Sequence, residues 1–144
     1  MRVDERQPGW LEFLDHTADV GIRVRAADRR ELFARAAWAL FAVIGDIGRV
    51  RPAEEWTVRV EATDPDALMV RWLSELNYLH QTRHVLLCAF EVQELTDTAL
   101  AARVRGEAIR ADHEIDAEIK AVTFHGFELA RDAGGWRAQV IFDV

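Results

Sequence analysis

The feature that most constrains the fold is a change of hydrophobic period partway along the chain. Apolar residues recur at helical spacing between Asp28 and Gly45 and again over 65–81. Every later segment alternates as a strand does; these segments are 85–95, 99–109, 117–131 and 136–144. Two helices followed by a run of strands predict an α+β fold, a single domain in which both helices pack on one face of a largely antiparallel or mixed sheet.

The helix starts carry the clearest local signals. Asp28 stands three residues before a glutamate, which is a capping-box pattern, and Asp64 precedes Pro65 at the first helical position. Residues 20–26 and 56–62 alternate apolar and polar side chains, so each predicts a half-exposed strand.

Length and composition fit one domain. The chain has 144 residues, of which half are hydrophobic and 30% charged. Because Pro8-Gly9 interrupts the chain, we expect 1–10 to be a loose N-terminal leader and 11–144 to be the folded domain. No apolar run reaches the roughly 18 residues of a membrane span, and no secretory signal precedes the domain. With a single cysteine, a cytoplasmic protein without membrane association is expected.

The charge balance bears on the class of partner. The formal net charge is −7 at pH 7, and the arginines are scattered among acids. A protein that grips RNA or DNA by itself needs a basic face, because neutralising phosphates supplies most of that affinity. We therefore expect no direct nucleic-acid binding.

Signals for catalysis by this chain are weak. Cys88 lies between bulky apolar neighbours on a predicted strand, where a buried thiol is inert. Ser74 lies mid-helix, outside any nucleophile elbow, and no glycine-rich phosphate loop occurs. His80 and His84 have the spacing of two zinc ligands, but a pair at a helix C-terminus that favours the dipole is the better interpretation. Residues 112–116 (DHEID) read as a solvated connection in which His113 faces a site, rather than a calcium loop.

Polar residues, several of them acidic, lie at both ends of the predicted domain. Asp15, His16, Thr17 and Asp19 lie just before a strand, and Asp143 lies one residue before the chain terminus. A turn explains the first group, and a frayed end explains the second. The strongly patterned strand WRAQVIF nevertheless predicts that the terminus is docked into the sheet.

The sequence resembles the archease family over residues 11–144. The matching pieces are FLDHTADVGIRV, ELFARAAWALFAVIGD, LMVRWLSELNYLH, the pair Gly106-Glu107, EIKAVTFHGFEL and WRAQVIFDV. The resemblance implies a protein that is not itself an enzyme. It implies a cofactor that transiently binds and activates the GTP-dependent tRNA-splicing RNA ligase, promoting its guanylylation and multiple turnover.

The resemblance also implies a divalent cation site formed by Asp19, Asp143 and Val144, the last through its terminal carboxylate or backbone oxygen. Converging carboxyl groups do not all stay ionised unless a positive charge joins them. Oxygen ligands favour a hard cation, calcium in the first place, with magnesium as the alternative.

Further motif residues are candidates for a functional surface around this site. They are Asp15, His16, Glu107, Lys120, Thr123 and His125. For each of them, an internal ion pair or hydrogen bond is an equally good explanation. Phe13 and Phe124 stand where the family commonly has tyrosine, so those phenol hydroxyls are absent.

Two other functions stay open at this stage. One is a chaperone-like modulator of RNA-modifying enzymes. The other is a small metal-dependent phosphoester hydrolase in which Asp19 and Asp143 bind the metal and His16 is the general base.

Overall fold

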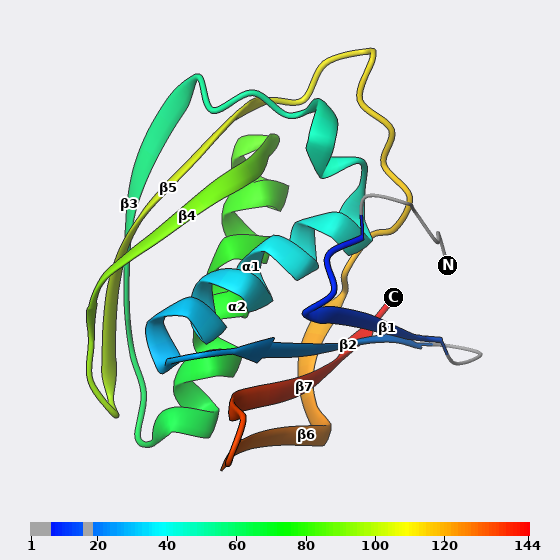
Figure 1. The fold of residues 1–144 in the computed structure, drawn as a ribbon. Coiled ribbons are helices and arrows are strands. Elements are labelled where there is room, and N and C mark those ends of the chain that lie inside the picture. Colours follow the sequence, from blue (N-terminus) through cyan, green and yellow to red (C-terminus); the bar gives the residue numbers. More distant parts are fainter. Residues whose placement is uncertain (1–6, 16–18) are drawn as a thin grey trace.

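Two antiparallel sheets enclose two helices in the computed structural model, which describes residues 7–15 and 19–144 (Figure 1). One sheet has four strands in the order β1-β2-β7-β6, and the other has three in the order β3-β5-β4. The elements in chain order are β1 (Leu11–Asp15), β2 (Asp19–Ala26), α1 (Arg29–Ile44), the 3₁₀ turn η1 (Ile47–Arg49), β3 (Glu54–Glu61), α2 (Pro65–Arg83), β4 (Val85–Leu95), β5 (Ala99–Ala108), β6 (Ala121–Asp132) and β7 (Gly135–Asp143).

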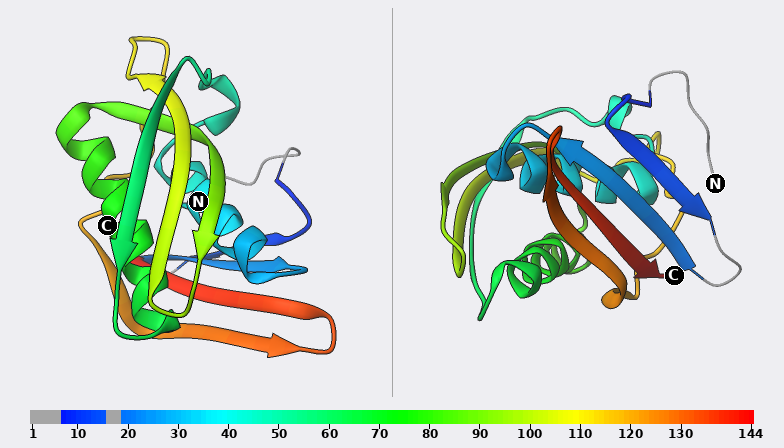
Figure 2. Two further views of the ribbon diagram at one scale, coloured as in Figure 1. Left: turned by 90° about the vertical axis from the view of Figure 1, so that its left-hand side faces the viewer. Right: turned by 60° about the horizontal axis from the view of Figure 1, so that its bottom comes forward.

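The α+β class is confirmed, and the strands divide into two sheets where one was expected. Both helices lie in the layer between the sheets, as the two further views show (Figure 2). All strand pairings are antiparallel. Alternation within a strand shows which face is buried but not which strand lies beside it, so the division was not visible in the sequence.

The predicted helix caps are confirmed. The Asp28 carboxylate accepts a hydrogen bond from the backbone N–H of Glu31 at 2.9 Å, and Asp64 accepts one from Ala67 at 2.8 Å. Pro65 is the first residue of α2, where its missing N–H costs nothing. The Trp72 indole N–H on α2 donates to the carbonyl of Phe33 on α1 at 2.8 Å, which joins the helices inside the core.

Two strand boundaries differ from the expectation. Leu11–Asp15 forms β1 and pairs with β2, a strand that the sequence did not predict, while the turn expected over 15–19 falls largely outside the described residues. Residues 117–120 lie outside β6, which begins at Ala121. Residues 1–6 lie outside the described residues, so the expected leader stays a prediction.

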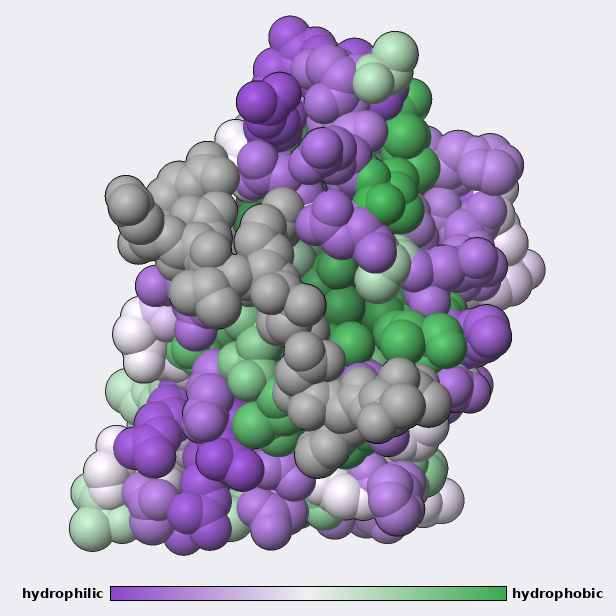
Figure 3. All heavy atoms as spheres, turned by 90° about the vertical axis from the view of Figure 1, so that its right-hand side faces the viewer, coloured by the Kyte–Doolittle hydropathy of each residue, from purple (hydrophilic) through white to green (hydrophobic). Residues whose placement is uncertain are grey.

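The face shown in Figure 3 is hydrophilic over most of its edge. On the right-hand side of Figure 1, an apolar area lies in the middle of a hydrophilic surround (Figure 3). The large hydrophobic side chains that are exposed are Tyr78, Ile115 and Phe124. No helix of the described part of the chain is long and apolar enough to cross a membrane.

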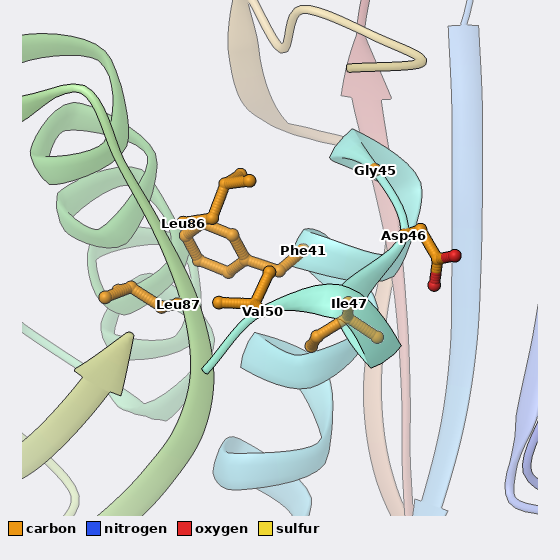
Figure 4. Close-up of a pocket in the computed structure, with 7 residues that line it drawn as sticks. All are labelled: Phe41, Gly45, Asp46, Ile47, Val50, Leu86 and Leu87. Carbon is orange, nitrogen blue, oxygen red and sulfur yellow. The ribbon is translucent and has the colours of Figure 1, made fainter. Parts of the chain in front are cut away.

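The core continues past the end of α1. Phe41, Ile47, Val50 and Leu87 meet where α1, η1 and β4 come together (Figure 4). The gap that they surround leaves no room for a water molecule. The chain that leaves α1 is thus held by close packing before it enters β3.

Candidate functional site: an acidic pair at the end of the four-stranded sheet

Pairing of β2 with β7 brings the two ends of the domain together. Asp19 and Asp143 are directly opposite each other in the ladder, and Ala121 of β6 is opposite Asp143 on its other side. Opposite residues of an antiparallel pair project to the same face with Cβ atoms about 5 Å apart. The side chains of Asp19 and Asp143 therefore leave the sheet from neighbouring positions on the same face.

The acidic pair lies on the outer face of this sheet. The next residues along the two strands, Val20 and Phe142, project to the opposite face, because side chains alternate along a strand. Phe142 and its neighbour Ile22 are fully buried in the core beneath the helices. Burial of that face fixes the register of β2 against β7, and this register places Asp19 opposite Asp143.

The Asp19 side chain has an unsatisfied oxygen. Its Oδ1 atom is buried and has no hydrogen-bond partner among the described residues. A buried polar atom without a partner is costly, and like charges directly opposite in a sheet repel each other. A hard cation bound between Asp19 and Asp143 relieves both penalties, so the donor set fits calcium or magnesium.

The C-terminus is held beside this pair, as the pattern of WRAQVIF predicted. The backbone N–H of Lys120 donates to the carbonyl of Asp143 at 2.7 Å, and the side chain of Val144 packs against the core. The backbone of Asp143 and the side chain of Val144 are therefore held in place next to the acidic pair.

Side chains alone do not complete a metal site in the described part of the chain. Within 7–15 and 19–144, no three His, Cys, Asp or Glu residues are grouped so that they hold a metal ion. Calcium takes six to eight oxygen ligands. The expected site thus depends on the Val144 oxygens in addition to Asp19 and Asp143, and on water.

The remaining predicted residues divide between this sheet end and other places. Lys120 is exposed directly before β6, and Thr123 donates its hydroxyl to the Ile141 carbonyl at 3.0 Å. His125 is exposed in the irregular part of β6 that follows Thr123. Asp15 ends β1, while His16 lies outside the described residues.

Sequence reasoning missed two residues that position Lys120. The carbonyl of buried Ile119 accepts hydrogen bonds from Asn77 Nδ2 and Gln81 Nε2, both at 2.8 Å. Helix α2 thereby fixes the segment that ends at Lys120. One signal was available, because Asn77 is a polar residue directly after Leu76 on the apolar side of the predicted helix.

Glu107 belongs to a different cluster, between β5 and the loops around it. Its carboxylate accepts from the Arg51 N–H at 2.8 Å and pairs with the guanidinium groups of Arg51 and Arg110, both at 3.3 Å. The hydrogen bond from the Arg51 backbone lowers the pKa of Glu107 below its ordinary value, against the opposing effect of burial. These contacts support the internal ion-pair explanation of Glu107.

His113 closes this cluster from the 112–116 connection. Its Nδ1 accepts the Arg110 backbone N–H at 2.8 Å, so Nε2 carries the proton and donates to Glu107 at 3.2 Å. The neighbouring residues of the connection are exposed as expected, whereas the His113 side chain is buried and faces Glu107.

The histidine pair lies at the C-terminal end of α2 as the sequence indicated, but burial lowers the pKa of His80 and so disfavours the cation that the helix dipole would attract. His80 Nδ1 donates to the Val85 carbonyl at 2.7 Å, and His84 ends the helix in the left-handed conformation. Burial raises the pKa of the Cys88 thiol, which keeps it protonated and unreactive.

Comparisons with known proteins place the chain in a family. Residues 11–144 match the model of the Archease protein family (MTH1598/TM1083). The chain is 38% identical over 138 residues to the protein archease of Methanosarcina mazei, covering 92% of this chain and 94% of that protein. It is also 38% identical over 142 residues to the protein archease of Methanothermobacter thermautotrophicus, covering 93% and 98%.

Solved structures share the fold. The solution structure of Methanobacterium thermoautotrophicum protein 1598 matches with a TM-score of 0.78 and 36% identity, covering 94% of this chain and 99% of that one. The crystal structure of a Thermotoga maritima archease, described as a possible chaperone, matches with a TM-score of 0.61 over 99% and 100% of the chains. At 20% identity, that second likeness shows the fold alone. Together, the family match and the relatives show that the chain belongs to the archease family.

Proposed function

We propose that this chain is a cytoplasmic, non-enzymatic cofactor that activates the GTP-dependent tRNA-splicing RNA ligase by promoting its guanylylation and multiple turnover. Membership of the archease family supports this proposal. The structural observation that carries it is the opposition of Asp19 and Asp143 with the unsatisfied Oδ1 atom of Asp19.

The residues of this sheet end have distinct parts in the proposed activity. Asp19, Asp143 and the terminal oxygens of Val144 hold a divalent cation, with calcium favoured over magnesium. The bound cation supplies the positive charge that lets the carboxylates stay close together. Lys120 adds an exposed ammonium beside the pair, at a position set by its backbone bond to Asp143.

The overall charge suits docking on an RNA ligase. The chain carries a net charge of −7, and an enzyme that binds RNA must present a basic face. Complementary charge raises the rate of encounter and orients the partners before contact. The proposed partner is thus the ligase itself and not its RNA.

The test is RNA sealing by the ligase of the same organism at large RNA excess, with GTP and Mn²⁺, with and without this chain. Many turnovers per ligase are expected with the chain and about one without it. Asp19→Asn and Lys120→Ala are expected to lose the stimulation. Glu91→Gln on β4 and Arg71→Ala on α2 are exposed controls that should retain it. Normal stimulation by both site variants would overturn the assignment of this surface.

A chaperone-like role is the second candidate, since the Thermotoga maritima protein of this fold is described as a possible chaperone. Suppression of aggregation of unrelated client proteins, without any effect on the ligase, would favour it. Hydrolysis of a phosphate ester by the chain alone would instead favour the hydrolase with Asp19, Asp143 and His16.

A further inference from the structure

A cleft of about 330 Å³ opens at the C-terminal end of α2. Its walls come from the last turn of the helix and from the connection between β5 and β6. None of the predicted metal ligands lines it. The volume lies at the lower end of the range of small-molecule sites, about 300 to 1,000 Å³.

His80 offers the cleft a hydrogen-bond acceptor. The side chain is only 8% exposed, and its Nδ1 atom donates to the Val85 carbonyl at 2.7 Å. A carbonyl oxygen only accepts, so in the neutral ring Nδ1 carries the proton and Nε2 has the lone pair. Among the described residues, Nε2 has no hydrogen-bond partner, and His80 lines the cleft. Burial lowers the pKa of His80, which favours this neutral form.

Two other features of the cleft favour a cation, and His84 contributes a second imidazole to its wall. Glu118 contributes a carboxylate, and the end of α2 contributes the negative pole of the helix dipole. The amide N–H of Gln81 is already donated to Ile119. No lysine or arginine is among the described residues that line the cleft.

The rest of the wall is apolar. This part of the wall consists of Ile109, Ile115 and Ala117, which belong to the connection between β5 and β6 and not to α2. Ile115 is 46% exposed although it is a large hydrophobic residue. Ile115 is also held in place, because it bridges to Gly45 at the end of α1. An ordered apolar wall facing acceptors suits a ligand with a hydrocarbon part and a charged donor group.

We propose that this cleft binds a small organic cation, an alkyl guanidinium or ammonium group. The hydrocarbon part lies against Ile109 and Ile115, and the N–H donors reach Glu118 and Nε2 of His80. The site is independent of the proposed action on the ligase, since it uses none of the residues of the acidic pair. A transition metal on the two histidines is the competing occupant, but no group of three metal-ligating side chains occurs in the described ranges.

The test is an NMR titration of the full chain at about pH 8, where histidines of ordinary pKa are neutral. The probe is n-butylguanidinium, and the control is n-butylurea, which has nearly the same shape without the charge. We expect the His80 ring and the Ile109 and Ile115 methyl signals to shift with butylguanidinium at millimolar concentration. Butylurea is expected to bind at least about tenfold more weakly.

Two variants make the result specific. Glu118→Gln is expected to weaken butylguanidinium binding about five- to tenfold, as when one charge-assisted hydrogen bond is lost. Glu114→Gln, in the same connection but outside the cleft, is expected to leave binding unchanged. A blocked Gly-Arg-Gly peptide distinguishes the source of the cation, since tighter binding of the peptide points to a side chain of a partner protein and tighter binding of butylguanidinium to a free metabolite.

Three results would overturn the proposal. The first is equal binding of butylurea and butylguanidinium, and the second is no shift at these residues up to about 20 mM probe. The third is a shift of the His80 ring with Zn²⁺ but none with butylguanidinium. Because the readout does not involve the ligase, failure here leaves the proposed function untouched, and failure of the ligase assay leaves this site untouched.

Discussion

Lys120 donates its backbone N–H to the carbonyl oxygen of Asp143 at 2.7 Å, which joins the start of β6 to the last residue of β7. The same Asp143 lies opposite Asp19 on its other side. Lys120, Asp19 and Asp143 thus come from three separate segments whose backbones lie together at one end of the four-stranded sheet.

The acidic pair should make stability depend on divalent cations. A ligand that binds only the folded state stabilises it by about 2.7 kcal/mol at a hundred times its dissociation constant. We expect calcium to raise the melting temperature of the unmodified chain over its value in EDTA, and Asp19→Asn to abolish the difference. Thermal unfolding monitored by circular dichroism measures it, with Glu91→Gln as the control that should respond as the unmodified chain does.

The two amides on Ile119 should act as a coupled pair. Asn77→Ala or Gln81→Ala alone leaves one donor on the Ile119 carbonyl, and each is expected to cost about 1 kcal/mol of unfolding free energy. The double variant leaves that buried carbonyl without a donor, so its cost should exceed the sum of the single costs. Urea unfolding of the four proteins gives the coupling energy. Simple additivity would show that Ile119 finds another donor.

Burial of His80 should make the fold less stable in mild acid. Its pKa is lowered in the folded state from the ordinary value of 6.5, chiefly by desolvation, so the unfolded chain binds more protons over this range. The contribution of His80 is therefore fully present above pH 6.5 and declines as the pH falls below that value. Urea unfolding at a series of pH values should show a smaller decline for His80→Gln than for the unmodified chain. An unchanged pH dependence would contradict the assignment.

Glu107 should make the free energy of unfolding depend on pH in a lower range than His80 does. Its pKa is lowered in the folded state from 4.5, so its contribution is present above 4.5 and is lost as the pH falls through the folded value. At neutral pH, Glu107→Gln is expected to lower the free energy of unfolding, because the neutral amide loses the charge that pairs with Arg51 and Arg110. Urea unfolding at neutral pH measures this cost against Glu91→Gln. Equal stability of the two variants would argue against the internal role.

Local features of the fold were predictable, and the arrangement of the strands was not. The caps at Asp28 and Asp64 are short-range patterns, and both helices begin where those patterns indicate. Strand order depends on contacts between residues far apart in the chain, such as Asp19 with Asp143, which alternation within one strand does not encode. The division into two sheets and the strand Leu11–Asp15 escaped prediction for this reason.

The candidate site shows the same division. The residues alone explained the acidic segments as turns or frayed ends, and the resemblance to archeases was needed to pair them. The structure then supplied the physical reason, which is the register of β2 against β7. Glu107, expected near the acidic pair, instead belongs to a separate cluster at the end of β5. There it contacts Arg51, Arg110 and His113.

The measurement that tests the central claim most directly is guanylylation of the ligase with GTP and Mn²⁺, compared for the unmodified chain and for Asp19→Asn at equal concentration. Circular dichroism first establishes that both proteins are folded. We predict that the unmodified chain accelerates guanylylation and that Asp19→Asn does not. Equal acceleration by both would contradict the role of the acidic pair, and acceleration by neither would contradict the proposed action on the ligase.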